Sequence, residues 1–374
     1  MFGKLIEQDQ KNEYILFFDF PETNGFALPE TARRHIVTAT TPTAVAAAAD
    51  GRRSLGDMWR MSRALSTAPC DLLIFPTVYS YVPVRTRAKK IVMIHDIIAE
   101  SFPKMTLPTP AARLFWKTKV ALGRWQADAI VTVSEYSRQG LVQMFGLDPA
   151  RVFVVGEAPD PIFRRLDNPV WPESLAKKGV DADGRTLIYV GGFGAHKNLP
   201  TLIDAFGQLT QQPGFEDVRL ILVGEYKKAV FLSHHDDLIT QIAELGLGKR
   251  VIFPGFMPDE ELVHLLNLGT ALALPSLMEG YGLPAVEAAA CGCPVIATTA
   301  SPLPDLLGAG GRFVAPDDVA GWVEALAEVL GSAETQQTMR QAGLTAVHSL
   351  TWDKAAAQMQ AVIDEVMGVS EATA

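Results

Sequence analysis

Residues 275–294 read PSLMEGYGLPAVEAAACGCP and hold two glutamates, Glu279 and Glu287, with seven residues between them. The apolar run ALAL at 271–274 precedes this stretch and is typical of a buried strand. Pro284 is well placed as the first residue of a helix, where a proline sacrifices no hydrogen bond. We therefore expect Glu279 in the loop that leaves a strand and Glu287 in the first turns of a short helix.

Gly292 suits the residue just past the end of that helix. In α/β proteins ligands bind at the carboxyl ends of parallel strands, so both glutamates are expected to face such a crevice. The glycines of the GYGLP turn also leave backbone N–H groups available to an anion or a hydroxyl-rich ligand. Two glutamates at this spacing often occur by chance as solvated residues, so the strand and the turn around them carry the argument.

Strand-like apolar segments alternate with helical ones along the chain. They lie at 14–18, 35–38, 72–75, 90–94, 129–133, 152–155, 186–190, 220–223, 251–253, 271–274 and 295–297. This rhythm predicts open, mostly parallel sheets with helices on both faces. Residues 158–172 are rich in proline and charge and are the expected linker between two such sheets.

The composition is that of a globular enzyme with large cores: 374 residues, 48% hydrophobic and 20% charged. No apolar run approaches the ~20 residues needed to span a bilayer, and the first residues show no signal-peptide pattern. Three cysteines are too few for a disulfide framework. Cys291 and Cys293 match no common zinc spacing and are interpreted as packing residues. We expect a cytoplasmic protein without a metal.

Charge is unevenly distributed. Residues 1–170 carry 21 Lys and Arg against 17 Asp and Glu, whereas the remainder carries 12 against 25. A basic first half can meet an anionic acceptor or the inner face of a membrane as a peripheral contact. An ordinary solvated surface is the simpler interpretation of so small an excess. Without a basic helix or interleaved aromatic and basic residues, no nucleic-acid partner is expected.

A second glycine-rich loop, GGFGAHKN at 191–198, follows the strand at 186–190. Gly192 and Gly194 let the backbone approach a ligand closely, and Lys197 supplies a point charge for phosphate beside a helix start. The loop is neither a dinucleotide fingerprint nor a P-loop, so neither NAD nor ATP is supported. After the next strand, Lys227 and Lys228 either approach the phosphates or are solvated.

The pair Glu279 and Glu287 around GYGLP resembles the E-x7-E signature of retaining, nucleotide-sugar-dependent glycosyltransferases with the GT-B fold, specifically glycosyltransferase family 4. The resemblance implies that Glu287 holds the ribose hydroxyls of the nucleotide and that Glu279 lies against the transferred sugar. Lys197 matches a lysine that grips the donor diphosphate. Many members carry an arginine where Gly192 stands. The donor diphosphate is therefore bound more weakly here, or other residues add to its binding.

The resemblance extends to two further places. The backbone around Phe256 and Met257 is expected to meet the nucleotide base. His95, at the end of the strand at 90–94, matches a histidine that contacts the donor sugar near the reaction centre. The expected catalytic residues are Glu279, Lys197 and His95, and the expected donor-binding residues are Glu287, Gly192, Gly194, Gly280, Tyr281, Gly282, Leu283, Phe256 and Met257.

By the same resemblance, two Rossmann-like, doubly wound domains face a central cleft. We expect an acceptor-side domain at 1–165, a donor-binding domain at 166–350 and a last helix, within 351–374, that crosses back to the first domain. Related enzymes begin with a strand and a glycine-rich loop that have no counterpart here. Either the chain begins after that element or this member dispenses with it, and we expect an incomplete first domain with exposed strand edges.

The predicted function is transfer of a hexose, with retention of configuration and without a metal or cofactor, from a UDP- or GDP-sugar to an acceptor hydroxyl. The acceptor is expected to be a saccharide or lipid-linked saccharide, as in cell-surface polysaccharide or glycolipid synthesis, and the transfer to be mannosyltransferase-like. Two alternatives stay open. One is a catalytically weak subunit that binds nucleotide sugars, and the other is a nucleotide-sugar epimerase of the same fold.

Overall fold

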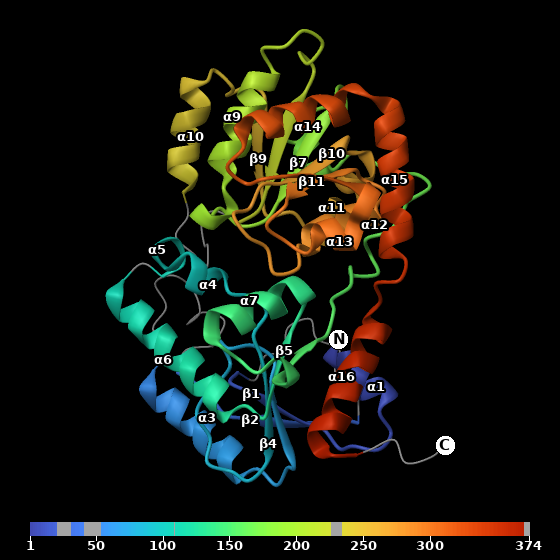
Figure 1. Cartoon of the computed structure of the whole chain (residues 1–374). Helices are drawn as coiled ribbons and strands as arrows, with labels where there is room; N and C mark the ends of the chain where they lie inside the picture. Colours follow the sequence, from blue (N-terminus) through green and yellow to red (C-terminus); the bar gives the residue numbers. More distant parts are fainter. Residues whose placement is uncertain (21–30, 41–53, 108, 226–233, 370–374) are drawn as a thin grey trace. The chain divides into compact units, whose positions relative to one another are not determined.

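The computed structural model describes residues 1–20, 31–40, 54–107, 109–225 and 234–369 (Figure 1). The chain forms two compact units. Unit 1 comprises Met1–Ile97, Leu107–Glu157 and Trp352–Ala374, and unit 2 comprises Ile98–Thr106 and Ala158–Thr351. Lys227 and Lys228 lie outside the described residues. Each unit has parallel strands and covering helices, which confirms the predicted α/β class.

Unit 2 contains a six-stranded parallel sheet in the order β12-β11-β10-β7-β8-β9. The strands are β7 (Thr186–Val190), β8 (Arg219–Val223), β9 (Val251–Gly255), β10 (Ala271–Leu274), β11 (Val295–Thr298) and β12 (Gly311–Val314). From β7 the chain builds outward to β9, then returns to the other side of β7 to begin β10. This arrangement is the predicted doubly wound sheet, and its switch point lies between β7 and β10.

The central strands of unit 2 are apolar along their whole length because both faces of a parallel sheet are covered. All four residues of β10 and all four of β11 are buried. The helices of this unit are α8 (Glu173–Ala176), α9 (Leu199–Leu209), α10 (His235–Glu244), α11 (Asp259–Leu268), α12 (Leu283–Ala290), α13 (Leu303–Leu307), α14 (Val319–Gly331) and α15 (Ala333–Val347). Two short helices from the first half of the chain, α4 (Ile98–Ser101) and α5 (Pro103–Thr106), also belong to it.

Unit 1 contains a four-stranded parallel sheet in the order β3-β4-β5-β6. Its strands are β3 (Leu72–Phe75), β4 (Lys89–Met93), β5 (Ala129–Thr132) and β6 (Val152–Val154). The helices of this unit are α1 (Phe2–Gln8), α3 (Leu55–Thr67), α6 (Pro110–Gln126), α7 (Glu135–Phe145) and α16 (Trp352–Met367). Leu5 of α1 and Met359 of α16 pack in one cluster with Ile91 and Val131 of the sheet. The last helix therefore contributes to the core of unit 1 (Figure 1).

A separate two-stranded parallel sheet in unit 1 pairs β1 (Ile15–Phe18) with β2 (Arg33–Ile36). All four residues of β1 are only half-buried, although the strand reads ILFF. Among the described residues, neither β1 nor β2 pairs with β3. Among the described residues, unit 1 thus has strand edges on two separate sheets.

Two strands differ from the sequence-based expectation. The sequence pattern predicts the second strand at 35–38, but β2 occupies Arg33–Ile36, where its register pairs Ile15 with Arg33 and Phe18 with Ile36. The short edge strand β12 was not anticipated, since its sequence GRFV follows a run of glycines. Among the described residues, the structure shows no helix long and apolar enough to cross a membrane.

Candidate functional site

The candidate site is built on the loops that leave β7 and β10, which are neighbours in the sheet of unit 2. The loop after β7 forms a short 3₁₀ helix, η2 (Ala195–Lys197), directly before α9. The loop after β10 runs to Gly282, before α12. Because parallel strands present their carboxyl ends at one edge, these two loops meet although they are far apart in the sequence.

Lys197 and Glu279 meet at this edge. The Lys197 Nζ lies 2.7 Å from the Glu279 Oε1, and the two side chains are 21% and 9% exposed. The Ser276 hydroxyl donates a hydrogen bond to the same Glu279 oxygen at 2.6 Å. A buried carboxylate is stable only when it is paired and hydrogen-bonded, and both conditions are met here. The cation and the anion are therefore held at one point of the loop cluster.

Backbone and amide contacts fix the two loops to each other. The Leu277 N–H donates to the His196 carbonyl at 2.9 Å. The Asn198 side-chain amide donates to the Pro275 carbonyl at 3.0 Å and to the Pro316 carbonyl at 2.6 Å. Asn198 itself adopts a left-handed conformation with φ 55° at the start of α9. The position of Lys197 is thus set by its neighbours on both sides.

Electrostatics at this edge follow from burial. Burial lowers the pKa of His196 to about 4, aided by the adjacent Lys197 charge and opposed by Glu279. Burial, together with the Glu279 charge, raises the pKa of Tyr189 well above its usual value. The Tyr189 hydroxyl donates to the Gly192 carbonyl at 2.5 Å and orders the first turn of the glycine loop. His196 is therefore neutral at physiological pH beside a charged lysine and carboxylate.

Two glycines are required by local geometry. Gly282 has φ +85°, and a Cβ there would lie 2.8 Å from the Leu303 side chain. At Gly224, a Cβ would lie 1.9 Å from the Gly191 carbonyl oxygen. A larger residue at Gly224 would therefore push apart the loops after β7 and β8, and one at Gly282 would push the turn after β10 away from α13. Close loop packing explains two glycines of this edge without reference to a ligand.

The turn and helix after Glu279 follow the predicted order. Tyr281 is buried, Gly282 precedes α12, and Pro284 lies in the first turn of a helix that begins at Leu283. Gly280 is buried, as are Gly282 and most of α12, while Glu287 is half-buried on that helix. The free N–H groups at the start of α12 therefore lie at the end of the turn that follows Glu279. Glu287 lies about one helical turn after the start of α12.

Phe256 and Met257 follow β9 at the same edge of the sheet but differ in environment. Phe256 is 70% exposed, whereas Met257 is 2% exposed. A large exposed aromatic ring at the carboxyl end of a strand is available for stacking, and the buried methionine is a packing residue. Gly194 precedes η2 in extended conformation.

His95 belongs to unit 1, where it follows β4, and it is described there by itself. It is half-buried, and its backbone carbonyl accepts a hydrogen bond from the Thr132 hydroxyl at 3.1 Å. Burial lowers its pKa, and the neighbouring Asp96 acts in the opposite direction. Glu157, after β6, has a pKa raised by burial first and by Asp96 as well. No sequence motif marks Glu157.

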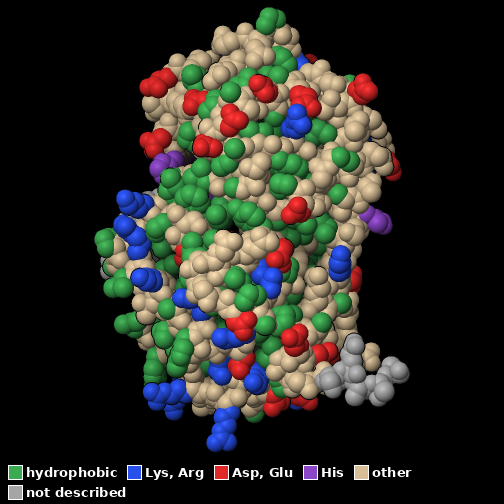
Figure 2. Space-filling view, in the orientation of Figure 1, with side chains coloured by type: hydrophobic (Ala, Val, Ile, Leu, Met, Phe, Trp, Pro, Cys, Tyr) green, Lys and Arg blue, Asp and Glu red, His purple; other side chains and the backbone are tan. Residues whose placement is uncertain are grey.

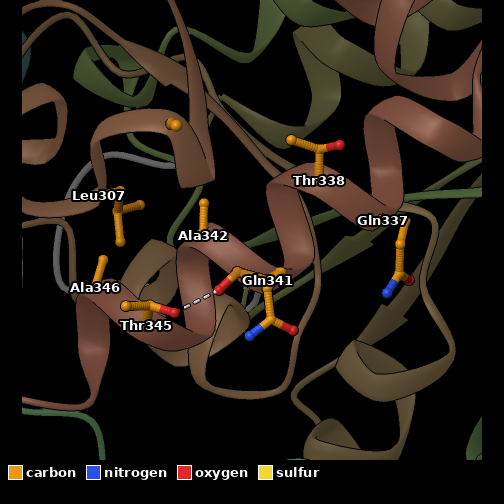
Figure 3. Close-up of a pocket in the computed structure, with 8 residues that line it drawn as sticks. Leu307, Gln337, Thr338, Gln341, Ala342, Thr345 and Ala346 are labelled. Carbon is orange, nitrogen blue, oxygen red and sulfur yellow. Dashed lines mark hydrogen bonds between the residues drawn. The ribbon is translucent and has the colours of Figure 1, made fainter.

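A cavity of about 690 Å³ lies elsewhere in unit 2, beside α15 (Figure 3). Its lining residues carry no charge; they are Leu307, Ala309, Gln337, Thr338, Gln341, Ala342, Thr345 and Ala346. None of the predicted site residues contributes to it.

In the part of the chain that the structure describes, no three His, Cys, Asp or Glu side chains are grouped as metal ligands would be. Cys291 and Cys293 are buried, and burial raises the pKa of the Cys293 thiol to about 12.

Sequence reasoning overlooked Ser276 and Asn198. Asn198 acts through the Pro275 and Pro316 carbonyls, which are distant in the sequence, so no local pattern marks it. Ser276 instead bonds Glu279, three positions later in the same loop. A small polar residue directly after a buried strand was the available signal for Ser276. Its position resembles that of residues that orient ligands at strand ends.

Comparison with known proteins gives two family matches. Residues 172–345 match the family described as "Glycosyl transferases group 1", and residues 10–161 match "Glycosyltransferase Family 4". Among curated proteins, the D-inositol 3-phosphate glycosyltransferase of Frankia alni is 31% identical over 60% of this chain and 54% of its own. The O-antigen chain mannosyltransferase B of Escherichia coli is 27% identical over 62% and 59%. The chain spans a little over half the length of these relatives.

Solved structures share the fold. A sucrose-phosphate synthase from Thermosynechococcus elongatus superposes with a TM-score of 0.75 at 18% identity, covering 98% of this chain and 92% of the other. Anabaena HepE, solved in complex with UDP and glucose, gives 0.68 at 19% identity, covering 90% and 87%. At these identities the similarity concerns the fold alone. The shared fold is GT-B, as the sequence analysis predicts.

Proposed function

The chain belongs to the glycosyl transferases group 1, glycosyltransferase family 4, and from that premise we propose that it transfers a hexose from a nucleoside-diphosphate sugar to an acceptor hydroxyl. The Anabaena neighbour of the same fold was solved with UDP and glucose, which supports a nucleotide-sugar donor. The acceptor we propose is a saccharide or lipid-linked saccharide.

One observation carries this proposal: the Lys197 Nζ and the Glu279 Oε1 lie 2.7 Å apart at the switch point between β7 and β10. A nucleotide-sugar donor requires a cation to bind its diphosphate. It also requires a hydrogen-bond acceptor for the hydroxyls of its sugar. Both are present at adjacent loop ends. When a donor binds, the Lys197 ammonium group leaves its ion pair with Glu279 and pairs with the diphosphate instead. The Glu279 carboxylate then accepts hydrogen bonds from sugar hydroxyls.

The remaining donor contacts follow from the same edge of unit 2. Glu287, on the first turns of α12, accepts hydrogen bonds from the two ribose hydroxyls, because a carboxylate can accept both. The exposed Phe256 ring and the adjoining backbone contact the base. The N–H groups at the start of α12, in the turn formed by Gly280, Tyr281, Gly282 and Leu283, face the sugar and diphosphate.

Catalysis in this proposal consists of positioning and charge stabilisation. The bond from the sugar to the diphosphate breaks, and negative charge develops on the leaving phosphate. Lys197 and helix N–H groups stabilise that charge, while the acceptor hydroxyl gives its proton to the departing phosphate. Attack on the face that the phosphate leaves retains the anomeric configuration. No metal or other cofactor takes part in this scheme.

The test uses the full chain and needs no known acceptor. The chain is incubated with UDP- and GDP-sugars, and released nucleoside diphosphate and sugar are quantified by mass spectrometry. We expect slow hydrolysis of one donor, with retained configuration of the released sugar by NMR, and loss of that activity in Glu279→Gln. Free epimerised donor would indicate an epimerase, and donor binding without turnover would indicate a binding subunit; either outcome overturns the proposal.

Lys249→Ala provides the matched control. Lys249 precedes β9 and therefore lies at the amino edge of the sheet, opposite the candidate site. Hydrolysis by Lys249→Ala should equal that of the unaltered chain. If it falls as far as that of Glu279→Gln, the effect is not specific to the site.

A further inference from the structure

The segment 98–106, which forms α4 and α5, belongs to unit 2 although the chain on both sides of it belongs to unit 1. Within unit 2, α5 (Pro103–Thr106) lies against η2 (Ala195–Lys197), and Cα atoms of the two elements come within 8 Å of each other. A short piece from the first half of the chain therefore reaches the loop that carries Lys197.

Internal hydrogen bonds hold this segment in shape. Pro103 begins α5, where a proline sacrifices no helical hydrogen bond. Thr106 is buried, and its hydroxyl and its N–H donate to the Phe102 carbonyl at 2.9 Å and 3.1 Å. The Phe102 N–H in turn donates to the Ile98 carbonyl at 2.9 Å, which joins α5 to α4. The backbone beside η2 is therefore hydrogen-bonded along its length.

The loops at the carboxyl edge of the unit 2 sheet carry little positive charge. In the described parts of the loops that leave the six strands, Lys197 is the only lysine or arginine. Its ammonium group is already paired with the Glu279 carboxylate at 2.7 Å. Burial lowers the pKa of the adjacent His196 to about 4, so this ring adds no charge at physiological pH. A diphosphate at this edge would therefore meet a single cation, which a carboxylate already neutralises.

Lys104 of α5 is a second cation beside the same loop. Its side chain is exposed, and in the part of the chain that the structure describes no carboxylate pairs with it. A lysine carries a compact charge on a flexible stem, so its ammonium group can turn toward a neighbouring anion without breaking an existing ion pair. Figure 2, in the orientation of Figure 1, shows Lys and Arg side chains at the surface beside α5.

We propose that Lys104 is a second binding residue for the donor diphosphate, brought to the Lys197 loop by the segment 98–106. This role rests on the proposed function, which makes a diphosphate the ligand of that loop. Lys104 and Lys197 contact the diphosphate together, and each ammonium group offsets part of its negative charge. The donor site of unit 2 then includes one residue from the first half of the chain.

The experiment is calorimetric titration of UDP and of GDP into the full chain and into variants of Lys104. For the nucleotide that binds, Lys104→Ala should raise the dissociation constant about fivefold to tenfold, because one charge-assisted contact is lost. Lys104→Arg should keep the affinity within about twofold, and Lys104→Glu should weaken binding more than alanine does. Added salt should weaken binding less in Lys104→Ala than in the unaltered chain.

Two control variants separate the charge of Lys104 from the shape of α5. Met105→Gln changes the neighbouring exposed residue of α5 and should leave the affinity unaltered. Lys249→Ala removes an exposed lysine at the opposite edge of the sheet and should also leave it unaltered. Equal loss of affinity in Lys104→Arg and Lys104→Ala would overturn the assignment, because α5 would then act by its shape alone.

The same titrations distinguish failure of this role from failure of the proposed function. Binding of UDP or GDP with equal affinity by Lys104→Ala and the unaltered chain would overturn the role of Lys104 and leave the proposed function standing. If neither nucleotide binds the unaltered chain, the proposed function fails, and the role of Lys104 fails with it.

Discussion

Replacing Lys197 with alanine should affect stability and catalysis to different extents. The change removes the Nζ that lies 2.7 Å from the Glu279 Oε1, and leaves a carboxylate that is 9% exposed with the Ser276 hydroxyl as its neighbour. Removing one partner of a fully buried ion pair costs ~3–5 kcal/mol. Because the Lys197 side chain keeps 21% of its surface exposed, water screens the pair, and we expect a loss of about 1–2 kcal/mol.

The catalytic cost should be larger. Lys197 stabilises charge that develops on the leaving diphosphate, and removing one such donor typically lowers turnover by about a hundredfold to a thousandfold. Donor hydrolysis by the full chain measures this quantity. Turnover should fall at least a hundredfold, while the thermal midpoint falls by only about 3–6 °C.

A second substitution separates the two effects. Adding Glu279→Gln to Lys197→Ala removes the uncompensated charge, so most of the lost stability should return. Turnover should remain at least a hundredfold low, because the diphosphate still has no cation and the Glu279 carboxylate is also absent. Chemical denaturation and donor hydrolysis, carried out on the same preparations, give both values.

Near-normal turnover in Lys197→Ala would refute this reasoning outright. Recovery of both stability and turnover in the double variant would also refute it, since Lys197 would then serve only to neutralise Glu279. Lys249→Ala controls for the general effect of losing a lysine.

Three further predictions concern other residues of unit 2. Gly282→Ala should lower stability by about 1–3 kcal/mol in denaturant titrations, because φ +85° and the Leu303 side chain both oppose a Cβ. Phe256→Ser should raise the KM for the donor about tenfold by removing base stacking, with stability unchanged; Val170→Ser, at another exposed apolar residue, should leave KM unaltered. His196 has a folded pKa of about 4 against 6.5 when unfolded, so the unfolded chain binds the extra proton between these values. Stability should therefore fall by up to about 3 kcal/mol as the pH falls from 6.5 to 4, and His196→Gln should flatten that dependence.

The sequence predicted the local pieces of unit 2 well. A buried strand at 271–274, a turn with Gly282 and a helix that ends before Gly292 were all correct, because each depends on residues close together in the chain. The parallel, doubly wound sheet followed from the alternation of these pieces. Short edge strands escaped detection where glycines surround them, as at β12.

The non-local contacts could not be predicted from spacing. Lys197 and Glu279 are 82 positions apart, and their pairing exists because β7 and β10 are neighbours at the switch point. Likewise, β2 begins at Arg33 instead of residue 35 because it pairs with β1, and this pairing is a contact between distant segments.

The most direct test of the donor site is calorimetric titration of UDP and of GDP into the full chain and into Glu287→Gln. The account predicts that one of these nucleoside diphosphates binds, and that Glu287→Gln weakens it about tenfold to a hundredfold by removing charge-assisted bonds to the ribose. Lys249→Ala should bind as the unaltered chain does. No binding of either nucleotide, or equal affinity in Glu287→Gln, would contradict the assignment of this edge of unit 2 to a nucleotide-sugar donor.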